Sequence, residues 1–333
     1  MKKLLPFAAL VLLQPFAAVP AVHAQASAAQ AAGKTKPSPL APSEIVAAAP
    51  NADWTAIRAS DLLVMELAPD AKGKPRRVVI QLIPPPFSQG WIGNIRKLAA
   101  VHWWDGLSIN RVQDNYVVQW GDANADDKVK ARKLPTGLAE MSESDYNHAA
   151  ITPQPGRASK TGWLNAREDA YGLNQFWRGW PLGRDAHSAP QQPAQSWPVH
   201  CYGMVGVGRD LSPNTGSGAE LYVVIGHAPR HLDRNIALVG RVIEGIEHLS
   251  SLPRGHGGLG FYDLAQGDER TEIVSIHPGV EVKDLPAYEY LSTESSSFAR
   301  YADARANRRD AFFIRPAGGA DVCNIPVPVR RVK

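Results

Sequence analysis

Arg111 is the residue whose type and surroundings most favour a catalytic role in this sequence. It lies in the stretch 107–112, where Leu107, Ile109 and Val112 are apolar, and Gln119 lies in the mainly apolar stretch 116–120. An arginine stays protonated and presents a rigid fork of N–H donors. Such a fork can donate a hydrogen bond to an atom that becomes a hydrogen-bond acceptor only in a transition state. This kind of catalysis requires neither a nucleophile nor a metal. From the residue alone, an ordinary salt bridge to Asp114 is the alternative.

Other spacings that could support chemistry are weaker. His227 and His231 have the spacing of metal ligands, but Pro229 between them excludes a regular helix and favours a solvated or packing role. The sequence contains no His-Glu-x-x-His or Gly-x-Ser-x-Gly motif, which argues against the common zinc proteases and serine hydrolases. We therefore expect no metal and no cofactor.

The segments that must position Arg111 are short strands. The stretches 62–67 and 77–82, separated by a turn at 69–75, predict a hairpin. Ser88 is a candidate N-cap for a helix reaching Trp103, and a short helix is expected over 244–249. The remaining predicted strands are 107–112, 116–120, 201–207, 221–225, 236–243 and 272–276. Many strands and few helices predict a mainly β fold, a closed antiparallel barrel capped by helices.

Four further segments surround or interrupt this predicted domain of residues 53–278. Residues 1–24, with Lys2 and Lys3 before an apolar run, predict a cleaved signal peptide and a periplasmic or secreted protein. Residues 25–52 are expected to be a disordered linker. Residues 123–200 form an insertion whose tryptophans are expected to pack on the barrel: Trp163, Trp177, Trp180 and Trp197. Residues 279–333 are a C-terminal extension with a predicted helix over 288–308 and strands near Phe312 and Val327.

Composition and cysteine content narrow the function classes. The formal net charge is +4, and without Lys2 and Lys3 it falls to +2, which gives no electrostatic case for binding nucleic acid. The only long apolar stretch is N-terminal, which excludes a polytopic membrane protein. Export would permit a disulfide between Cys201 and Cys323, and two buried thiols are the alternative.

Three segments, in this order, resemble the cyclophilin family of peptidyl-prolyl isomerases. They cover roughly residues 60–122 and 200–277. The first is Pro86-Phe87 with Gly93-Asn94-Ile95-Arg96-Lys97-Leu98; the second runs from Trp104-Asp105-Gly106 through Arg111 to Gln119-Trp120-Gly121-Asp122; the third is Pro213-Asn214-Thr215-Gly216-Ser217-Gly218 with Leu232-Asp233 and Val239-Gly240-Arg241-Val242.

The resemblance implies roles for particular residues. Arg111 matches the catalytic arginine of the family, and Gln119 matches the glutamine that orders it. The positions that line or border the proline pocket are Tyr116, Val117, Tyr222, Leu232, His231 and Ile236. Tyr222 replaces a phenylalanine (Val223 is the alternative match), Ile236 replaces a histidine and Glu220 replaces a glutamine, changes expected to alter substrate preference and to lower the rate.

The implied activity is cis–trans isomerisation of X–Pro bonds in unfolded or partly folded exported polypeptides. The implied mechanism is non-covalent: an apolar slot grips the proline and the arginine donates to the twisted amide. The alternative is a peptide-binding chaperone on the same barrel with weak or no isomerase activity.

Overall fold

The computed structural model describes residues 39–151, 167–187, 189 and 192–332. The chain divides into two units, residues 1–37 and 38–333, and every described residue belongs to the second. The predicted signal peptide and the first half of the predicted linker (residues 25–38) lie outside the described residues, as does Trp163 of the insertion.

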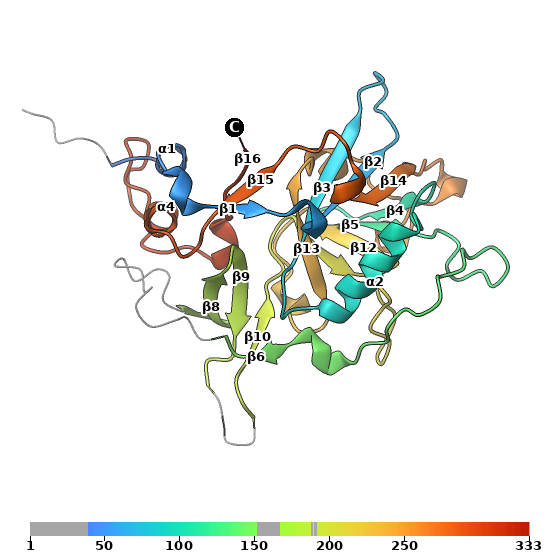
Figure 1. Ribbon diagram of the computed structural model, residues 1–333, viewed down its shortest axis with the longest axis horizontal. Helices are drawn as coiled ribbons and strands as arrows, with labels where there is room; N and C mark the ends of the chain where they lie inside the picture. Colours follow the sequence, from blue (N-terminus) through green and yellow to red (C-terminus); the bar gives the residue numbers. More distant parts are fainter. Residues whose placement is uncertain (1–38, 152–166, 188, 190–191, 333) are drawn as a thin grey trace, which may run out of the picture. The chain divides into compact units, whose positions relative to one another are not determined.

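An eight-stranded antiparallel sheet forms the centre of this unit, with the strand order β14-β2-β3-β13-β11-β12-β5-β4 (Figure 1). Its strands are β2 (Leu62–Leu67), β3 (Arg76–Leu82), β4 (Ser108–Val112), β5 (Val117–Gly121), β11 (Met204–Val207), β12 (Leu221–Val224), β13 (Leu238–Glu244) and β14 (Ile273–Pro278). The two outer strands meet through an isolated bridge between Ser108 and Glu272 and a 2.8 Å hydrogen bond from the Ile273 N–H to the Leu107 carbonyl. The sheet is therefore a nearly closed barrel, which confirms the predicted fold class.

Alternation along the strands separates a buried face from an outer one. On β5, Val118 and Trp120 belong to the main hydrophobic core, whereas Gln119 points to the opposite face. Helix α2 (Gln89–Ala100) adds Trp91 and Leu98 to the same core. The short helix α3 (Glu247–Ser250) follows β13.

Part of the predicted insertion folds into a second sheet of five strands, in the order β6-β10-β9-β8-β7 (Figure 1). Its strands are β6 (His148–Ala149), β7 (Arg167–Asp169), β8 (Gly172–Trp177), β9 (Trp180–Arg184) and β10 (Gln195–Pro198). Trp180 and Leu182 on β9 are buried in the main core. Since they share the barrel's core, this sheet is packed on the barrel as one hydrophobic unit.

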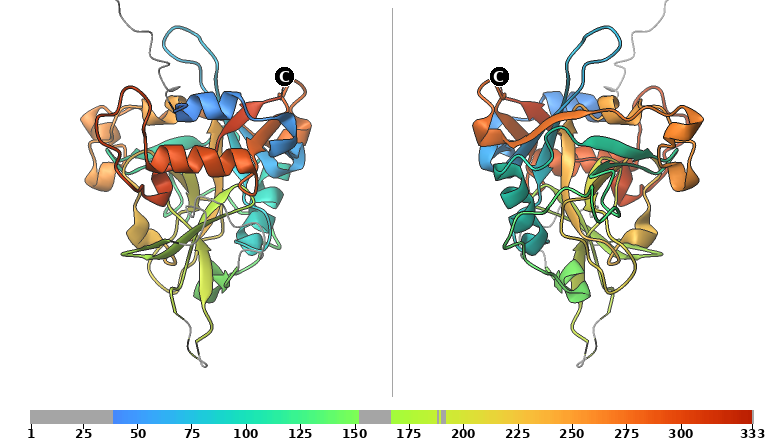
Figure 2. Two further views of the ribbon diagram at one scale, coloured as in Figure 1. Left: turned by 90° about the vertical axis from the view of Figure 1, so that its left-hand side faces the viewer. Right: turned by 90° about the vertical axis from the view of Figure 1, so that its right-hand side faces the viewer.

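The N-terminal and C-terminal segments pack on each other. Helices α1 (Pro42–Ala47) and α4 (Ser296–Ala306) lie side by side in both views of Figure 2, and Ile45 and Phe298 share a small hydrophobic core. Strands β1 (Trp54–Ile57), β15 (Tyr288–Leu291) and β16 (Val329–Arg331) of the same segments form a three-stranded sheet.

Two expectations for these segments differ from the structure. Residues 42–47 are helical rather than part of a disordered linker, because α4 supplies the apolar surface that the local sequence lacks. The predicted helix over 288–308 is instead strand β15 followed by α4, since Ser295 caps the helix by accepting a 3.0 Å hydrogen bond from the Phe298 N–H. Phe312 lies in a turn, and the last strand begins at Val329.

A disulfide joins Cys201, just before β11, to Cys323 in the C-terminal segment. Cys201 and Cys323 are therefore a disulfide and not two buried thiols. The bond attaches the C-terminal segment to the barrel. Within the described residues, no helix has both the length and the apolar character needed to cross a membrane.

Candidate active site

Arg111, Gln119 and Tyr222 form one row across three neighbouring strands. Arg111 on β4 is paired with Gln119 on β5, and Gln119 is paired with Tyr222 on β12. A register shift between Ile109 and Arg111 marks a bulge in β4. Bulges re-aim side chains, and this one places Arg111 beside Gln119 on the face opposite to the main core.

Neutral groups surround the Arg111 guanidinium. Nε donates to the Leu259 carbonyl at 2.7 Å, Nη1 donates to Gln119 Oε1 at 3.3 Å, and Nη2 donates to Gln113. The aromatic rings of Tyr116 and Phe261 lie 5.6 and 5.4 Å from its Cζ atom. Burial lowers the pKa of Arg111, yet an arginine stays protonated at any physiological pH.

The alternative partner of Arg111 is engaged elsewhere. Asp114 Oδ1 lies 2.9 Å from Nε of Arg254 and pairs with that residue. The interpretation of Arg111 as half of a salt bridge with Asp114 is therefore wrong.

A small apolar cluster adjoins Arg111 on the same face. Val117, Tyr222 and Val224 are buried in it, and Tyr116 and Ile236 pack against them. Four of these five side chains are predicted pocket residues. Val224 is an addition: it lies two residues after Tyr222 on β12, and its side chain therefore points to the same face of the sheet. The cluster provides an apolar surface beside the N–H donors of Arg111.

Tyr222 keeps its hydroxyl away from this surface. The hydroxyl forms a 2.9 Å hydrogen bond with Nε2 of the buried His200, and the two rings are stacked with centroids 6.3 Å apart. Gly206 on the neighbouring strand β11 makes room, because a Cβ there would come within 2.3 Å of the tyrosine oxygen. Burial raises the pKa of Tyr222 well above its usual value. The ring thus faces the cluster as a phenylalanine would.

The other two predicted pocket residues lie at the rim. Leu232 ends the 3-10 turn η4 (Arg230–Leu232) and is half-buried, while His231 is exposed. His231 and Tyr116 line a cavity of about 550 Å³, together with Tyr171 from the inserted sheet and Tyr202 and Asp321. The inserted sheet and the tail therefore reach the edge of the candidate site.

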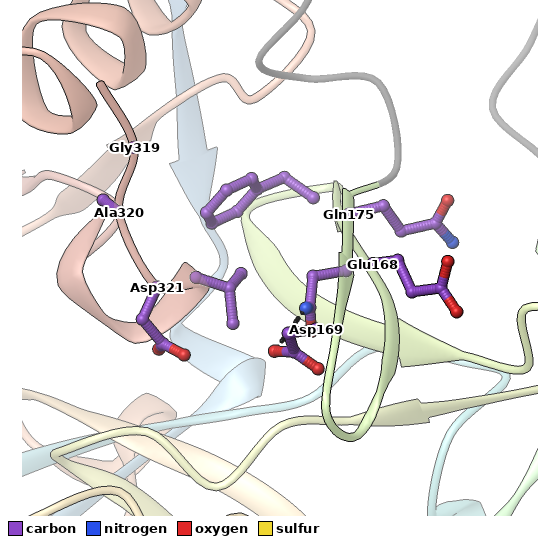
Figure 3. Close-up of a pocket in the computed structure, with 9 residues that line it drawn as sticks. Glu168, Asp169, Gln175, Gly319, Ala320 and Asp321 are labelled. Carbon is purple, nitrogen blue, oxygen red and sulfur yellow. Dashed lines mark hydrogen bonds between the residues drawn. The ribbon is translucent and has the colours of Figure 1, made fainter. Parts of the chain in front are cut away.

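Arg230 binds these segments together. Its Nε lies 2.8 Å from Asp233 Oδ2, and its Nη1 lies 3.0 Å from Asp169 Oδ2 and 3.7 Å from Asp321 Oδ2. Figure 3 shows the carboxylates of Asp169, on the inserted sheet, and Asp321, on the tail, facing the same space while Glu168 points away. Asp233 also accepts a 2.8 Å hydrogen bond from Nδ1 of His200, so the network continues to Tyr222. Both His200 and Arg230 are buried.

Glu220 lies on the other side of Gln119. Burial raises the pKa of Glu220 to about 7, although hydrogen bonds from the Asp122 backbone and the Gln119 side chain oppose the shift. Its Oε1 atom is buried without a hydrogen-bond partner in the structure. Gly121 leaves the space that the carboxylate fills, since a Cβ at Gly121 would overlap it at 2.0 Å.

Sequence reasoning missed most of these supporting residues. Their spacing carries no local pattern, because His200, Arg230 and Asp233 belong to loops and Phe261 approaches Arg111 from a distant segment. The sequence indicated only one of them, Glu220, because the family that the chain resembles has a neutral glutamine at that position.

A family model matches the part of the chain that contains Arg111, Gln119 and Tyr222. Residues 91–260, just over half of the chain, match the family model described as cyclophilin type peptidyl-prolyl cis-trans isomerase/CLD. The crystal structure of the cyclophilin AquaCyp293 from Hirschia baltica superposes with a TM-score of 0.60 at 20% identity, covering 84% of this chain and 94% of that one. A cyclophilin type peptidyl-prolyl cis-trans isomerase from Cryptosporidium parvum gives a TM-score of 0.35 at 12% identity over 65% of this chain and 96% of that one. No curated protein matches the sequence.

Proposed function

The chain belongs to the family of cyclophilin-type peptidyl-prolyl cis-trans isomerases, and we propose that it uses Arg111 and the adjoining apolar cluster to accelerate rotation about X–Pro bonds in polypeptides. The substrates would be unfolded or partly folded chains with an accessible proline. The reaction needs no cofactor, since no bond is made or broken in a rotation.

The observation that carries this proposal is the position of the Arg111 fork beside the apolar cluster on one face of the sheet. Amide resonance opposes rotation with a barrier of about 18–20 kcal/mol. When the amide twists, its nitrogen becomes pyramidal and its lone pair can accept a hydrogen bond. A donor placed at that nitrogen acts only on the twisted state, so it lowers the barrier rather than tightening substrate binding.

The cluster and Gln119 would divide the remaining tasks. The rings of Tyr116 and Tyr222 with Val117 and Ile236 offer an apolar surface to the proline ring. Gln119 is a positioning residue in this mechanism, because its Oε1 accepts from Arg111 Nη1 at 3.3 Å and so orients the guanidinium.

We further propose that the protein acts on exported polypeptides in the periplasm or outside the cell. The N-terminal sequence has the charged and apolar regions of a signal peptide. The bonded Cys201–Cys323 pair supports an oxidising compartment, since disulfides persist there and are rare in the cytosol.

A second function has one observation in its favour. The 550 Å³ cavity beside the candidate site carries Tyr171 and Tyr202, which are 46% and 51% exposed. Exposed aromatic side chains next to a peptide site suit a chaperone that holds unfolded segments, with isomerisation weak or absent.

A protease-coupled isomerisation assay on an X–Pro peptide, run beside an aggregation assay on an unfolded client, separates the two functions. For the isomerase, wild type accelerates isomerisation and Arg111→Ala loses most of that rate. If wild type and Arg111→Ala are equally slow while both suppress aggregation, the chaperone function replaces the isomerase function.

A further inference from the structure

A group of potential metal ligands lies outside the candidate active site, at the seam where the barrel closes. His102 follows α2, Asp105 lies in the turn before β4, and His277 lies on β14. One ligand atom from each residue lies within 4.8 Å of the others. The seam here is closed by backbone hydrogen bonds, including one of 2.8 Å from the Gly106 N–H to the Ile273 carbonyl.

The distances suit a small tetrahedral ion. Asp105 Oδ2 lies 2.8 Å from His277 Nε2 and 3.8 Å from His102 Nδ1. Ligand atoms that bind Zn²⁺ at about 2.0–2.1 Å in a tetrahedron lie roughly 3.3 Å from one another. To bind an ion, His277 Nε2 must release the proton that it donates to Asp105 Oδ2, and the two stacked rings must turn so that their lone pairs converge. The exposed position of His102 leaves room for that rotation. Two imidazoles and one carboxylate are a ligand set that Zn²⁺ accepts, with water in the fourth position.

The hydrogen bonds around the group are those of an oriented metal site. His102 Nε2 lies 3.1 Å from Oε2 of Glu281, and because a carboxylate only accepts, this nitrogen carries the proton. In the neutral ring, the lone pair is then on Nδ1, which faces Asp105. The other oxygen of Asp105 accepts a 3.1 Å hydrogen bond from the Ile276 N–H. Ligating histidines and carboxylates are typically held in this way by a second set of groups.

The end of helix α2 determines where His102 lies. Helix α2 ends with two bonds, from the Trp103 N–H to the Leu98 carbonyl at 2.9 Å and from the His102 N–H to the Ala99 carbonyl at 3.0 Å. This pattern places His102 at a left-handed position, φ 53°, where glycine is the usual residue. The turn that ends the helix brings the His102 imidazole beside that of His277, with ring centroids 3.9 Å apart.

We propose that His102 Nδ1, Asp105 Oδ2 and His277 Nε2 bind one Zn²⁺ ion, with Glu281 orienting the His102 ring. The ion would connect the end of α2, the segment before β4 and strand β14. It would therefore stabilise the closure of the barrel, and its binding should raise the stability of the folded protein.

Calorimetric titration of ZnCl₂ into the full chain, purified without a histidine tag, tests the site. We expect one equivalent to bind, and His102→Asn and His277→Gln to weaken binding at least about tenfold, asparagine being chosen because it tolerates the left-handed backbone. Glu281→Gln keeps all three ligands and should weaken binding about 10–100-fold. The control His187→Ala, an exposed histidine elsewhere, should bind as wild type does.

Thermal unfolding gives a second readout that does not depend on isomerase activity. Saturating Zn²⁺ should raise the melting temperature of wild type and of His187→Ala but leave His102→Asn and His277→Gln unchanged. Circular dichroism spectra like that of wild type would establish that both variants fold. Binding of less than one equivalent, or equal affinity in wild type, His102→Asn and His277→Gln, would overturn the proposal.

Discussion

At the scale of single residues, two neighbouring arginines show what distinguishes Arg111. Arg254 is paired with the carboxylate of Asp114, whereas Arg111 contacts carbonyl oxygens and aromatic faces. A guanidinium has more N–H groups than these contacts use. Arg111 therefore keeps a full positive charge with donors available beside the apolar cluster.

Glu220 adds a titratable group behind Gln119. Because burial raises its pKa to about 7 from 4.5, the folded protein holds this proton more tightly than the unfolded chain does. Its stabilising contribution is complete below pH about 4.5 and is lost as the pH rises through about 7, at a cost of about 3 kcal/mol in unfolding free energy. Glu220→Gln should thus equal wild type in stability at pH 4 and exceed it at pH 8.

Urea denaturation at both pH values measures this difference. Glu269→Gln, which changes an exposed glutamate, serves as the control and should match wild type at each pH. A stability difference between Glu220→Gln and wild type that does not change from pH 4 to pH 8 would contradict the assignment.

At the scale of elements, the turn η4 depends on segments far away in the chain. Arg230 and Asp233 are both buried, and their ion pair connects η4 to His200 and Tyr222. Asp169 approaches the same arginine from the inserted sheet, but its side chain is 28% exposed. The two carboxylates should therefore differ strongly in what they contribute.

Replacing each aspartate by asparagine tests this difference. Asp233→Asn leaves a buried cation without its main partner and should lower the unfolding free energy by about 3–5 kcal/mol. Asp169→Asn should cost about 1 kcal/mol or less, because a partly exposed pair is screened by water. Urea denaturation decides, and similar losses in the two variants would show that burial does not control the network.

The sequence predicts elements well where a local pattern exists. The hairpin of β2 and β3, helix α2 and the strands carrying Arg111 and Gln119 follow from apolar periodicity and turn residues. The row of Arg111, Gln119 and Tyr222 follows from strand pairing once the barrel is expected. The network of His200, Arg230 and Asp233 could not be predicted, because its members meet only through tertiary packing. The proposed zinc ligands His102 and His277 also meet only through tertiary packing, whereas the expectation of no metal rested on local spacing alone.

At the scale of the whole described unit, the inserted sheet and the tail are integrated with the barrel. Arg241 on β13 is buried, donates to Gln81 Oε1 at 2.8 Å and to the Gly179 carbonyl at 2.7 Å, and stacks over Trp180 at 4.6 Å. Burial lowers its pKa to about 10. This buried cation therefore bonds a barrel strand to the inserted sheet.

The disulfide should reinforce this integration. Cys201 and Cys323 are 122 residues apart, so the bond removes much freedom from the unfolded chain. Replacing both cysteines by serine should lower the unfolding free energy by about 2–5 kcal/mol, as measured by urea denaturation. Isomerase activity should persist, because neither cysteine touches the Arg111 row. Unchanged stability would mean that the tail contributes little to the fold.

The most direct test of the central claim is kcat/KM for isomerisation of an X–Pro peptide by wild type, Arg111→Ala, Arg111→Lys and Arg254→Ala. Removing one donor aimed at a transition state costs about 10²–10³-fold in rate. We predict a loss of that size in Arg111→Ala and a partial loss in Arg111→Lys, which keeps the charge but not the fork. Arg254→Ala should retain activity, because its partner is Asp114. A kcat/KM for Arg111→Ala equal to that of Arg254→Ala would contradict the account.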